Sequence, residues 1–183
     1  MHKTTQLNNF NNSWYNSGAG NIKKLAWYLT NALFFNSSFP FIGIKHFILR
    51  FYGAKVGKGL IIKNHVNIKY PWYLNIGDHC WIGEKVWIDN LAPVLIADNV
   101  CISQGAMLLT GNHNYKKETF DLMVGEIKIE KGVWIGAKSI ICPGLTLKSH
   151  SVISVGSVLT QNTEPYYIYQ GNPAQKIKQR IIA

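Results

Sequence analysis

The chain carries an aliphatic residue at every sixth position over most of its length. Each of these positions holds Leu, Ile or Val, and the residue four places later is mostly small or β-branched. A period of six does not fit a helix, which repeats every 3.6 residues, and a half-buried antiparallel strand would alternate every two. The pattern therefore predicts short strands separated by tight corners. The positions are Val56, Ile62, Ile68, Ile76, Ile82, Ile88, Ile96, Ile102, Leu108, Ile129, Ile135, Ile141, Leu147, Ile153 and Leu159.

Three such hexads close one triangular coil, so the array predicts a parallel β-helix of about five coils. Neighbouring coils would pair as parallel strands about 4.8 Å apart. No coil buries its inner face alone, so the array is stable only as a stack with capped ends. The spacing widens to eight at residues 68–76 and 88–96, which predicts a two-residue bulge at a corner each time. Gly57, Gly77, Gly83 and Gly136 follow the aliphatic position, where little bulk or a special φ is expected.

The pattern divides the chain into three regions. Residues 1–53 form an N-terminal arm and helical cap, and residues 54–163 form the repeats, with an inserted loop at 114–128. Residues 164–183 form a basic C-terminal tail. The class is therefore an all-β repeat protein with a helical arm and one loop insertion.

The arm predicts two helices that plug the open end of the coil. Asn21 is expected to cap a helix from Ile22 to about Phe35, and a second helix is expected from Pro40 to Arg50. One apolar stripe of the first helix should face the coil. The stripe consists of Ile22, Leu25, Ala26, Leu29 and Leu33.

Residues 25–44 carry no charge, which raises the question of a membrane span. Asn31, Asn36 and Pro40 interrupt this stretch, so a span is not expected, whereas an interfacial amphipathic helix stays open. The N-terminus is polar and shows no apolar secretory segment.

Charge is spread unevenly along the 183 residues. The net charge is +10, and residues 1–77 carry nine Lys or Arg and no Asp or Glu. A basic, aromatic front end suits an anionic membrane surface, an acidic partner or an anionic ligand, and the alternative is that the basic side chains only solvate the cap. No nucleic-acid partner is expected. The three Cys residues cannot all pair, which favours a reducing, cytoplasmic compartment.

His113 is the main candidate for chemistry because it lies where the one long insertion opens. Imidazole has the reference pKa closest to neutral pH, which suits general base catalysis. None of the other histidines opens an insertion, so His65, His79 and His150 are expected at corners or in solvent. No second His follows His113 before His150, so no metal site is expected. The cysteines are expected to be structural.

The motifs Trp87-Ile88-Asp89-Asn90-Leu91, Thr110-Gly111-Asn112-His113 and Gly171-Asn172-Pro173-Ala174 lie along this repeat array. With them the chain resembles the hexapeptide-repeat acyltransferases, and among these the colanic acid biosynthesis acetyltransferases, over nearly its whole length. The resemblance implies left-handed coils, a homotrimer with active sites between subunits, and acetyl-CoA as co-substrate.

The resemblance also implies roles for single residues. His113 would be the general base. Lys85 stands where related enzymes carry an orienting Asn, so this detail departs from the family. Glu84 and Asp89 are candidates to orient or assist His113, and Asn90, Asn112, Asn114 and Tyr115 are candidates to bind the acceptor.

Coenzyme A is implied to lie along the coils after the insertion. The pantetheine would meet Trp134, Gly136, Ala137, Ser154 and Val155. Basic residues of the tail would meet the phosphates, although Gln161 stands where relatives carry a phosphate-site Lys. These basic residues are Lys176 and Lys178, with Arg180 near them.

The sequence thus predicts a cytoplasmic O-acetyltransferase. It would acetylate a hydroxyl of a sugar in a bacterial surface polysaccharide or its precursor, with a peripheral contact at the inner face of the membrane left open. Two other interpretations remain: an N-acyltransferase acting on an amino sugar, and a non-catalytic β-helix scaffold.

Overall fold

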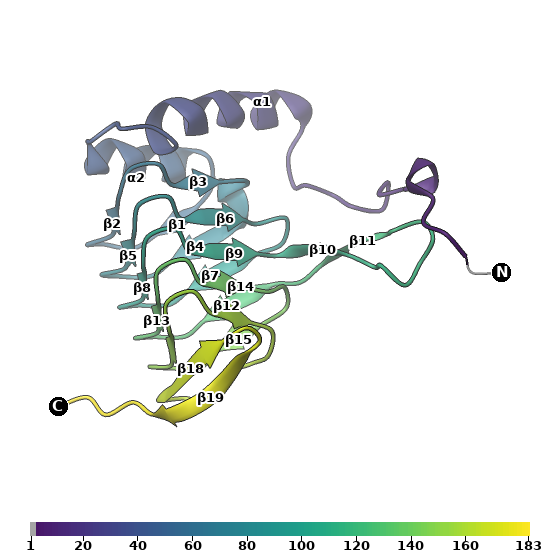
Figure 1. Cartoon of the computed structure of the whole chain (residues 1–183). Helices are drawn as coiled ribbons and strands as arrows, with labels where there is room; N and C mark the ends of the chain where they lie inside the picture. The colour runs from purple at the N-terminus through teal and green to yellow at the C-terminus, as the bar shows by residue number, and fades with distance from the viewer. Residues whose placement is uncertain (1–2) are drawn as a thin grey trace.

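The computed structural model describes residues 3–183. The chain forms a left-handed parallel β-helix with two helices across its N-terminal end (Figure 1). Three sheets make its faces. Sheet A holds β1 (Lys55–Val56), β4 (Leu74–Ile76), β7 (Val94–Ile96), β12 (Ile127–Ile129) and β15 (Thr146–Leu147). Sheet B holds β2 (Ile61–Ile62), β5 (Trp81–Ile82), β8 (Cys101–Ile102), β13 (Trp134–Ile135), β16 (Val152–Ile153), β18 (Tyr167–Gly171) and β19 (Ala174–Gln179). Sheet C holds β3 (Asn67–Ile68), β6 (Trp87–Asp89), β9 (Met107–Leu109), β14 (Ile140–Ile141) and β17 (Val158–Leu159).

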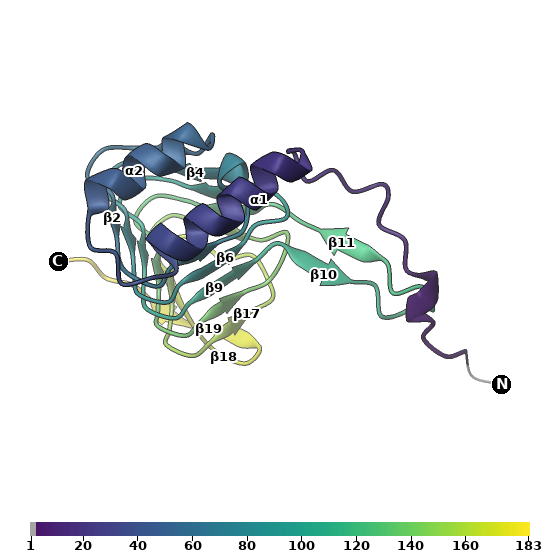
Figure 2. The same cartoon turned by 90° about the horizontal axis from the view of Figure 1, so that it is seen from above.

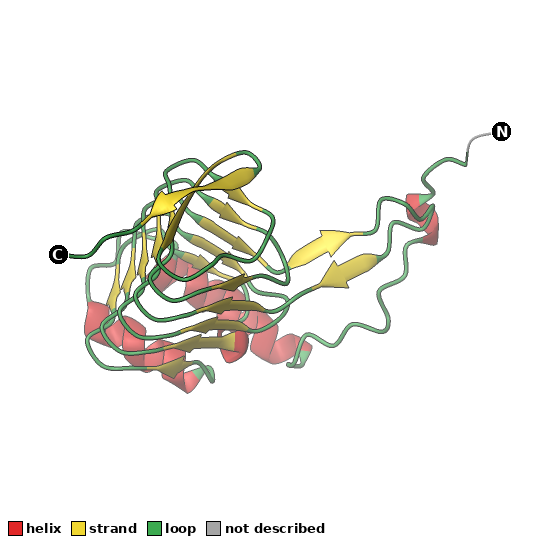
Figure 3. Cartoon of the chain, turned by 90° about the horizontal axis from the view of Figure 1, so that it is seen from below, coloured by secondary structure: helices red, strands yellow, loops and turns green. Residues whose placement is uncertain are grey.

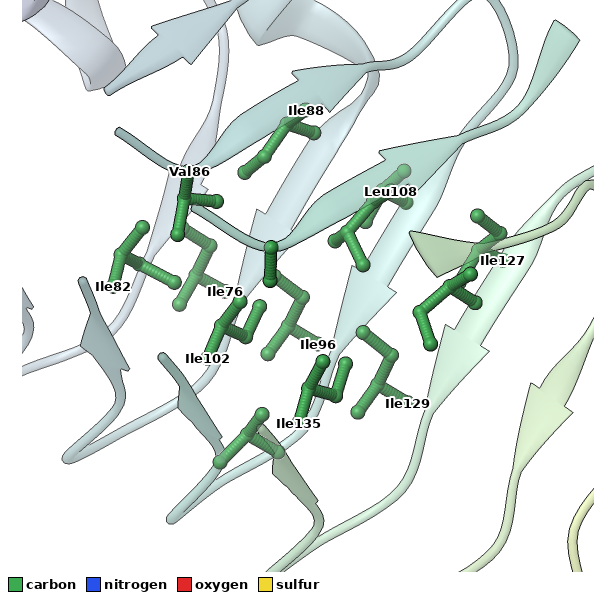
Figure 4. Close-up of a cluster of buried hydrophobic side chains, with 14 of the residues drawn as sticks. Ile76, Ile82, Val86, Ile88, Ile96, Ile102, Leu108, Ile127, Ile129 and Ile135 are labelled. Carbon is green, nitrogen blue, oxygen red and sulfur yellow. The ribbon is translucent and has the colours of Figure 1, made fainter. Parts of the chain in front are cut away.

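The predicted hexad positions form the core of this β-helix. The parallel register places Ile82 beside Ile102 and Ile102 beside Ile135, so equal positions of successive coils stack (Figure 4). All of the aliphatic hexad positions are buried except Val56, which lies in the first strand and is half-buried. Burying one such side chain is worth about 1.5–3 kcal/mol. The predicted β-helix of about five coils is confirmed, and β18 begins a sixth turn by pairing with β16.

The corners of the coils explain the positions of His65, His79 and His150. The third residue after the aliphatic position has a positive φ in coil after coil, as at His65 (58°), His79 (55°) and His150 (59°). At Gly136 the requirement is space instead, because an added Cβ would lie 2.6 Å from the backbone nitrogen of Val155 in the next coil. Glycine there permits close stacking of the coils.

The insertion folds as an antiparallel hairpin that projects away from the coils (Figures 1 and 2). Its strands are β10 (Gly111–His113) and β11 (Leu122–Val124). This differs from the loop expected at 114–128, because the chain leaves the coil at Gly111 and Lys128 already lies in β12. The two widened corners lie at residues 68–76, which include the short helix η3 (Pro71–Tyr73), and at 88–96.

The arm contains the short helix η1 (Leu7–Asn9), α1 (Asn21–Thr30), the π-helical turn η2 (Asn31–Phe35) and α2 (Ile42–Phe51). Its contact face differs from the expected stripe. Trp27 and Phe35 are buried against the coil, and the Trp27 indole donates a hydrogen bond to the Ile68 carbonyl (2.8 Å). The larger aromatic groups fill the open end, so Leu25 and Leu29 face outward. The expected cap at Asn21 is also wrong, because Gly20 is the N-cap residue and no side chain caps this helix.

The C-terminal region is a strand pair rather than a loose tail (Figure 3). β18 pairs in parallel with β16, and β19 returns antiparallel to β18. Basic residues expected in a tail, Lys176 and Lys178, therefore have fixed positions on β19.

Candidate active site

His113 is the last residue of β10 and pairs with Leu122 of β11. Its Nδ1 lies 2.9 Å from the backbone oxygen of Phe120. A carbonyl oxygen only accepts hydrogen bonds, so Nδ1 carries the proton and donates it in the neutral imidazole. Nε2 then holds the free lone pair, which is the state a general base requires.

Two phenyl rings hold the imidazole in place. The Phe120 ring stacks on it at 4.5 Å between centroids with an interplanar angle of 7°, and the Phe10 ring lies 5.6 Å away at 57°. Phe120 has a φ of 51°, in the left-handed region that a bulky side chain rarely adopts. Such strain costs of the order of 1–2 kcal/mol and is found where a site requires a fixed geometry.

Polar contacts close the tip of the hairpin behind His113. Lys117 Nζ donates to Asp121 Oδ2 at 2.7 Å, and Thr119 Oγ1 donates to Asp121 Oδ1 at 2.6 Å. The hydrogen bond from Lys117, followed by that from Thr119, lowers the pKa of the Asp121 carboxyl. The Asn114 amide donates to the Asp121 carbonyl, which joins the two sides of the tip.

The N-terminal segment runs from α1 to the hairpin tip (Figures 1 and 2). The Gln6 amide donates to the Glu118 carbonyl at 2.7 Å, and the Tyr15 hydroxyl donates to the Leu91 carbonyl at 2.7 Å. Burial raises the pKa of Tyr15 above its ordinary value, so the phenol stays a donor. These anchors bring Phe10 to His113. Phe10 carries no signal in the sequence, because it lies in an Asn-rich stretch without hydrophobic periodicity.

Three of the expected acceptor-binding residues lie beside His113 on the hairpin. Asn112 Oδ1 accepts the His113 backbone amide at 2.8 Å. Asn114 is half-buried, and Tyr115 is 76% exposed. Their side chains can therefore meet a polar substrate that approaches the imidazole.

Asn90 has a structural role instead of the expected substrate contact. It is fully buried, and its side chain donates to the Tyr70 carbonyl (2.6 Å) and accepts the Tyr70 amide (2.9 Å). The side chain thereby replaces a backbone pair across the widened corner, and no part of it is accessible to a ligand.

Asp89 and Glu84 do not contact His113 within one chain. The Lys69 ammonium lies 2.9 Å from Asp89 Oδ1, and Asp89 lines a cavity of about 410 Å³ under α1 with Tyr70. Glu84 lies at the corner between β5 and β6, at the opposite end of sheet C from the hairpin. Neither carboxylate orients the imidazole from its own chain, and the Phe120 carbonyl does so instead.

A groove of about 570 Å³ on sheet B gathers the residues expected to meet coenzyme A. The Trp134 indole donates to Ser103 Oγ at 2.9 Å, which fixes the ring at the groove wall. Lys178 lines the groove from β19. The expected residues among its lining are Trp134, Gly136, Ala137, Ser154, Val155 and Lys178.

Lys176 was expected to meet the phosphates together with Lys178, but its side chain contacts Glu164 and Tyr167 instead. Its ammonium lies 2.7 Å from Glu164 Oε1 and 4.5 Å from the centre of the Tyr167 ring. The hydrogen bond that the Lys176 ammonium donates to the Glu164 carboxylate raises the pKa of Lys176. Lys176 is therefore neutralised by its own chain, and Lys178 is the cation that faces the groove.

The remaining reactive groups form no second site. Over residues 3–183, no cluster of three or more His, Cys, Asp or Glu side chains could hold a metal ion. Burial raises the pKa of the Cys80, Cys101 and Cys142 thiols, so their nucleophilic thiolate forms are rare near neutral pH. Cys101 lies in strand β8.

The imidazole and the groove lie on opposite sides of one chain. The hairpin leaves from sheet C at one side, whereas strands β5, β8 and β13 of sheet B lie at the other side (Figures 1 and 2). A histidine with a free Nε2 on a projecting hairpin and a groove of about 570 Å³ on sheet B suit the class of β-helix acyltransferases.

The comparisons with known proteins agree with this class. The family model for the hexapeptide repeat of succinyl-transferase matches residues 126–161. The colanic acid biosynthesis acetyltransferase WcaF of Escherichia coli (strain K12) is 31% identical over 165 residues, which covers 90% of this chain and 91% of that protein. The chain belongs to the hexapeptide-repeat acetyltransferases, and acetyl-CoA is its co-substrate.

Solved structures share the fold. A galactoside acetyltransferase in complex with coenzyme A has a TM-score of 0.77 and 26% identity, covering 86% of this chain and 80% of that one. A Vibrio cholerae O1 biovar eltor acetyltransferase solved with acetyl-coenzyme A has a TM-score of 0.80 and 23% identity, covering 91% and 93%. The expected enzyme class and co-substrate are confirmed.

Proposed function

We propose that this protein is an O-acetyltransferase that acetylates a hydroxyl of a sugar in a bacterial surface polysaccharide or its precursor. The observation that carries the proposal is the His113 imidazole, whose Nδ1–H donates to the Phe120 carbonyl and whose Nε2 is free. The relatives named for colanic acid biosynthesis and for galactoside acetylation support a sugar as the acceptor class.

The reaction follows from this tautomer. Nε2 takes the proton of the sugar hydroxyl while the hydroxyl oxygen attacks the carbonyl carbon of the thioester. The tetrahedral intermediate then collapses, the carbon–sulfur bond breaks, and the imidazolium returns its proton to the departing thiolate. The products are an acetyl ester and coenzyme A with a free thiol, and no covalent enzyme intermediate forms. General base catalysis of this kind contributes typically 10²–10⁴-fold.

The groove on sheet B is proposed to hold acetyl-CoA. Its wall of Trp134 and Val155 suits the pantetheine chain, whereas the backbone amides of Gly136 and Ser154 already donate to the Ile153 and Tyr169 carbonyls. Lys178 would meet a phosphate at the nucleotide end. Lys176 would contribute less, because Glu164 already neutralises it.

The working unit is proposed to be a homotrimer. The hairpin of one subunit would bring His113 to the groove of its neighbour, since the two lie on opposite sides of a single chain. Trp81 (58% exposed) and Trp134 (48% exposed) on sheet B are large apolar groups typical of a subunit contact. In this arrangement Asp89 or Glu84 could meet only a neighbouring subunit's hairpin.

The proposed location is the cytoplasm, where acetyl-CoA and nucleotide-activated or lipid-linked sugars are available. A cytoplasmic acetyltransferase would act on the polysaccharide precursor before export. The three unpaired thiols are consistent with a reducing compartment.

The test follows thiol release from acetyl-CoA with a panel of sugars and amino sugars, and identifies the product by NMR. We expect acetyl esters from the wild type and a loss of about 10²-fold or more in kcat for His113→Asn. His79→Asn is the matched control, because Asn tolerates the positive φ of that corner. Amide products only would identify an N-acyltransferase, and unchanged turnover in His113→Asn would disprove the proposed base.

A further inference from the structure

The outer side of the N-terminal helices is apolar although it faces away from the protein. α1 and α2 lie across the end of the β-helix (Figures 1 and 2). On α1 and η2 the aromatic residues Trp27 and Phe35 face the coil, and four aliphatic side chains on the other side remain 53–87% exposed. These are Ile22, Leu25, Leu29 and Leu33.

α2 buries Leu49 but also a charged side chain, and it exposes two phenyl groups. Lys45 is fully buried, and its ammonium donates to the Lys63 carbonyl (3.2 Å) and to Asn64 Oδ1 (3.1 Å). Phe47 and Phe51 are 69% and 74% exposed on the opposite side. Burying an ammonium is costly, and burying a phenyl group is favourable, so this orientation indicates an apolar environment outside the helix.

Positive charge is concentrated at the same end of the molecule as this apolar side. Residues 1–77 contain nine Lys or Arg and no acidic residue. Lys55 and Lys63 are exposed on the first coil beneath α2, whereas the Lys23 ammonium lies over the Trp72 ring and Arg50 donates to the Val56 carbonyl. A membrane interface has a matching arrangement, because its apolar layer is bordered by anionic headgroups. A second copy of this end would be equally basic and would repel it.

We propose that the outer helix face, defined as Ile22, Leu25, Leu29, Leu33, Phe47 and Phe51, docks on an anionic phospholipid surface. Over residues 3–183 no helix is long and apolar enough to cross a bilayer. The helices therefore lie in the interface with their outer sides among the acyl chains and their basic residues at the headgroups. The hairpin leaves the coils sideways, so docking keeps it accessible (Figure 1).

The experiment is flotation of the full chain with vesicles of phosphatidylcholine alone or mixed with phosphatidylglycerol. It measures binding without turnover, so its outcome is independent of the proposed reaction. The test variant is Leu25→Gln/Leu29→Gln/Phe47→Gln, which keeps good helix formers. The control is Ile181→Gln/Ile182→Gln, because these side chains are 89% and 55% exposed at the other end of the molecule.

We expect the wild type and the control to float with phosphatidylglycerol vesicles, and not with phosphatidylcholine alone. The triple variant should bind at least about tenfold more weakly while thiol release in solution is unchanged. A wild type that stays in the unbound fraction with both vesicles would overturn the proposal. So would a lower molar mass of the triple variant in light scattering, because the face would then be a contact between copies of this chain.

Discussion

Removing the Phe10 ring tests whether the N-terminal segment positions the imidazole. The Phe10 and His113 ring centroids lie 5.6 Å apart, within the range of a favourable aromatic pair. Such a pair is worth about 0.5–1.5 kcal/mol, which corresponds to a factor of about 2–13 in rate if the pair holds the productive orientation. For Phe10→Ala we therefore expect kcat to fall by about this factor.

The assay is thiol release with the concentrations of acetyl-CoA and of the sugar each varied, so that kcat and both KM values are measured. The KM for acetyl-CoA should not change, because Phe10 does not line the groove. Phe10→Leu should lose part of the effect, since it keeps an apolar cover but no ring. Trp14→Ala is the control, because Trp14 is exposed on the same segment and contacts Tyr15 instead of His113. An unchanged kcat in Phe10→Ala, or an equal fall in the Trp14 control, would refute a positioning role.

Three further predictions concern the hairpin, the groove and the thiols. The lowered pKa of Asp121 means that its contribution to hairpin stability is present above its ordinary value of 3.8 and is lost as the pH falls through the lowered pKa. Asp121→Asn should therefore increase hydrogen exchange of the hairpin amides near pH 7, and an unchanged exchange rate would contradict this. Lys178→Glu should raise the KM for acetyl-CoA about fivefold or more, with a smaller effect for Lys176→Glu, whereas equal effects would contradict the separate orientations of the two side chains. The three thiols should react with iodoacetamide at least about tenfold more slowly in the native protein than in urea, as followed by mass spectrometry, and one thiol that reacts equally fast in both would contradict their burial.

The hexad pattern predicts the β-helix because only an apolar side chain is tolerated at each inward position. Ile82, Ile102 and Ile135 stack in one column, and any polar residue there would be buried without a partner. The hairpin ends were harder to predict, since Gly111 and Lys128 differ little in sequence from neighbouring loop and strand residues.

In the arm, hydrophobic periodicity alone does not predict which side of α1 packs on the coil. α1 is apolar on both sides, and a count of apolar positions favours Leu25 and Leu29 over Trp27 as the contact face. The structure selects Trp27 because one indole with a hydrogen bond to Ile68 fills the open coil better than two aliphatic groups. No sequence rule predicts that Lys45 is buried, because its partners come from the first coil.

The candidate site could be predicted only in part, because some of its residues come together only in the folded chain. His113 stands out because it opens the insertion, and the groove residues follow from register and resemblance. Phe10 and the Phe120 carbonyl are brought to His113 only by the fold of the hairpin and the path of the N-terminal segment. Asn90 was predicted to bind a substrate, but its side chain amide forms two hydrogen bonds to the Tyr70 backbone across the widened corner.

The central claim is that His113 of one subunit acts on acetyl-CoA held in the groove of another. Two variants that are each inactive, His113→Asn and the groove variant Val155→Trp/Lys178→Glu, should be co-expressed and assayed for thiol release. Random mixing into a trimer places an intact base beside an intact groove at about a quarter of the sites, so we expect about a quarter of the wild-type rate. No activity in the mixed assemblies would contradict the claim, because a site within one chain always keeps one of the two lesions.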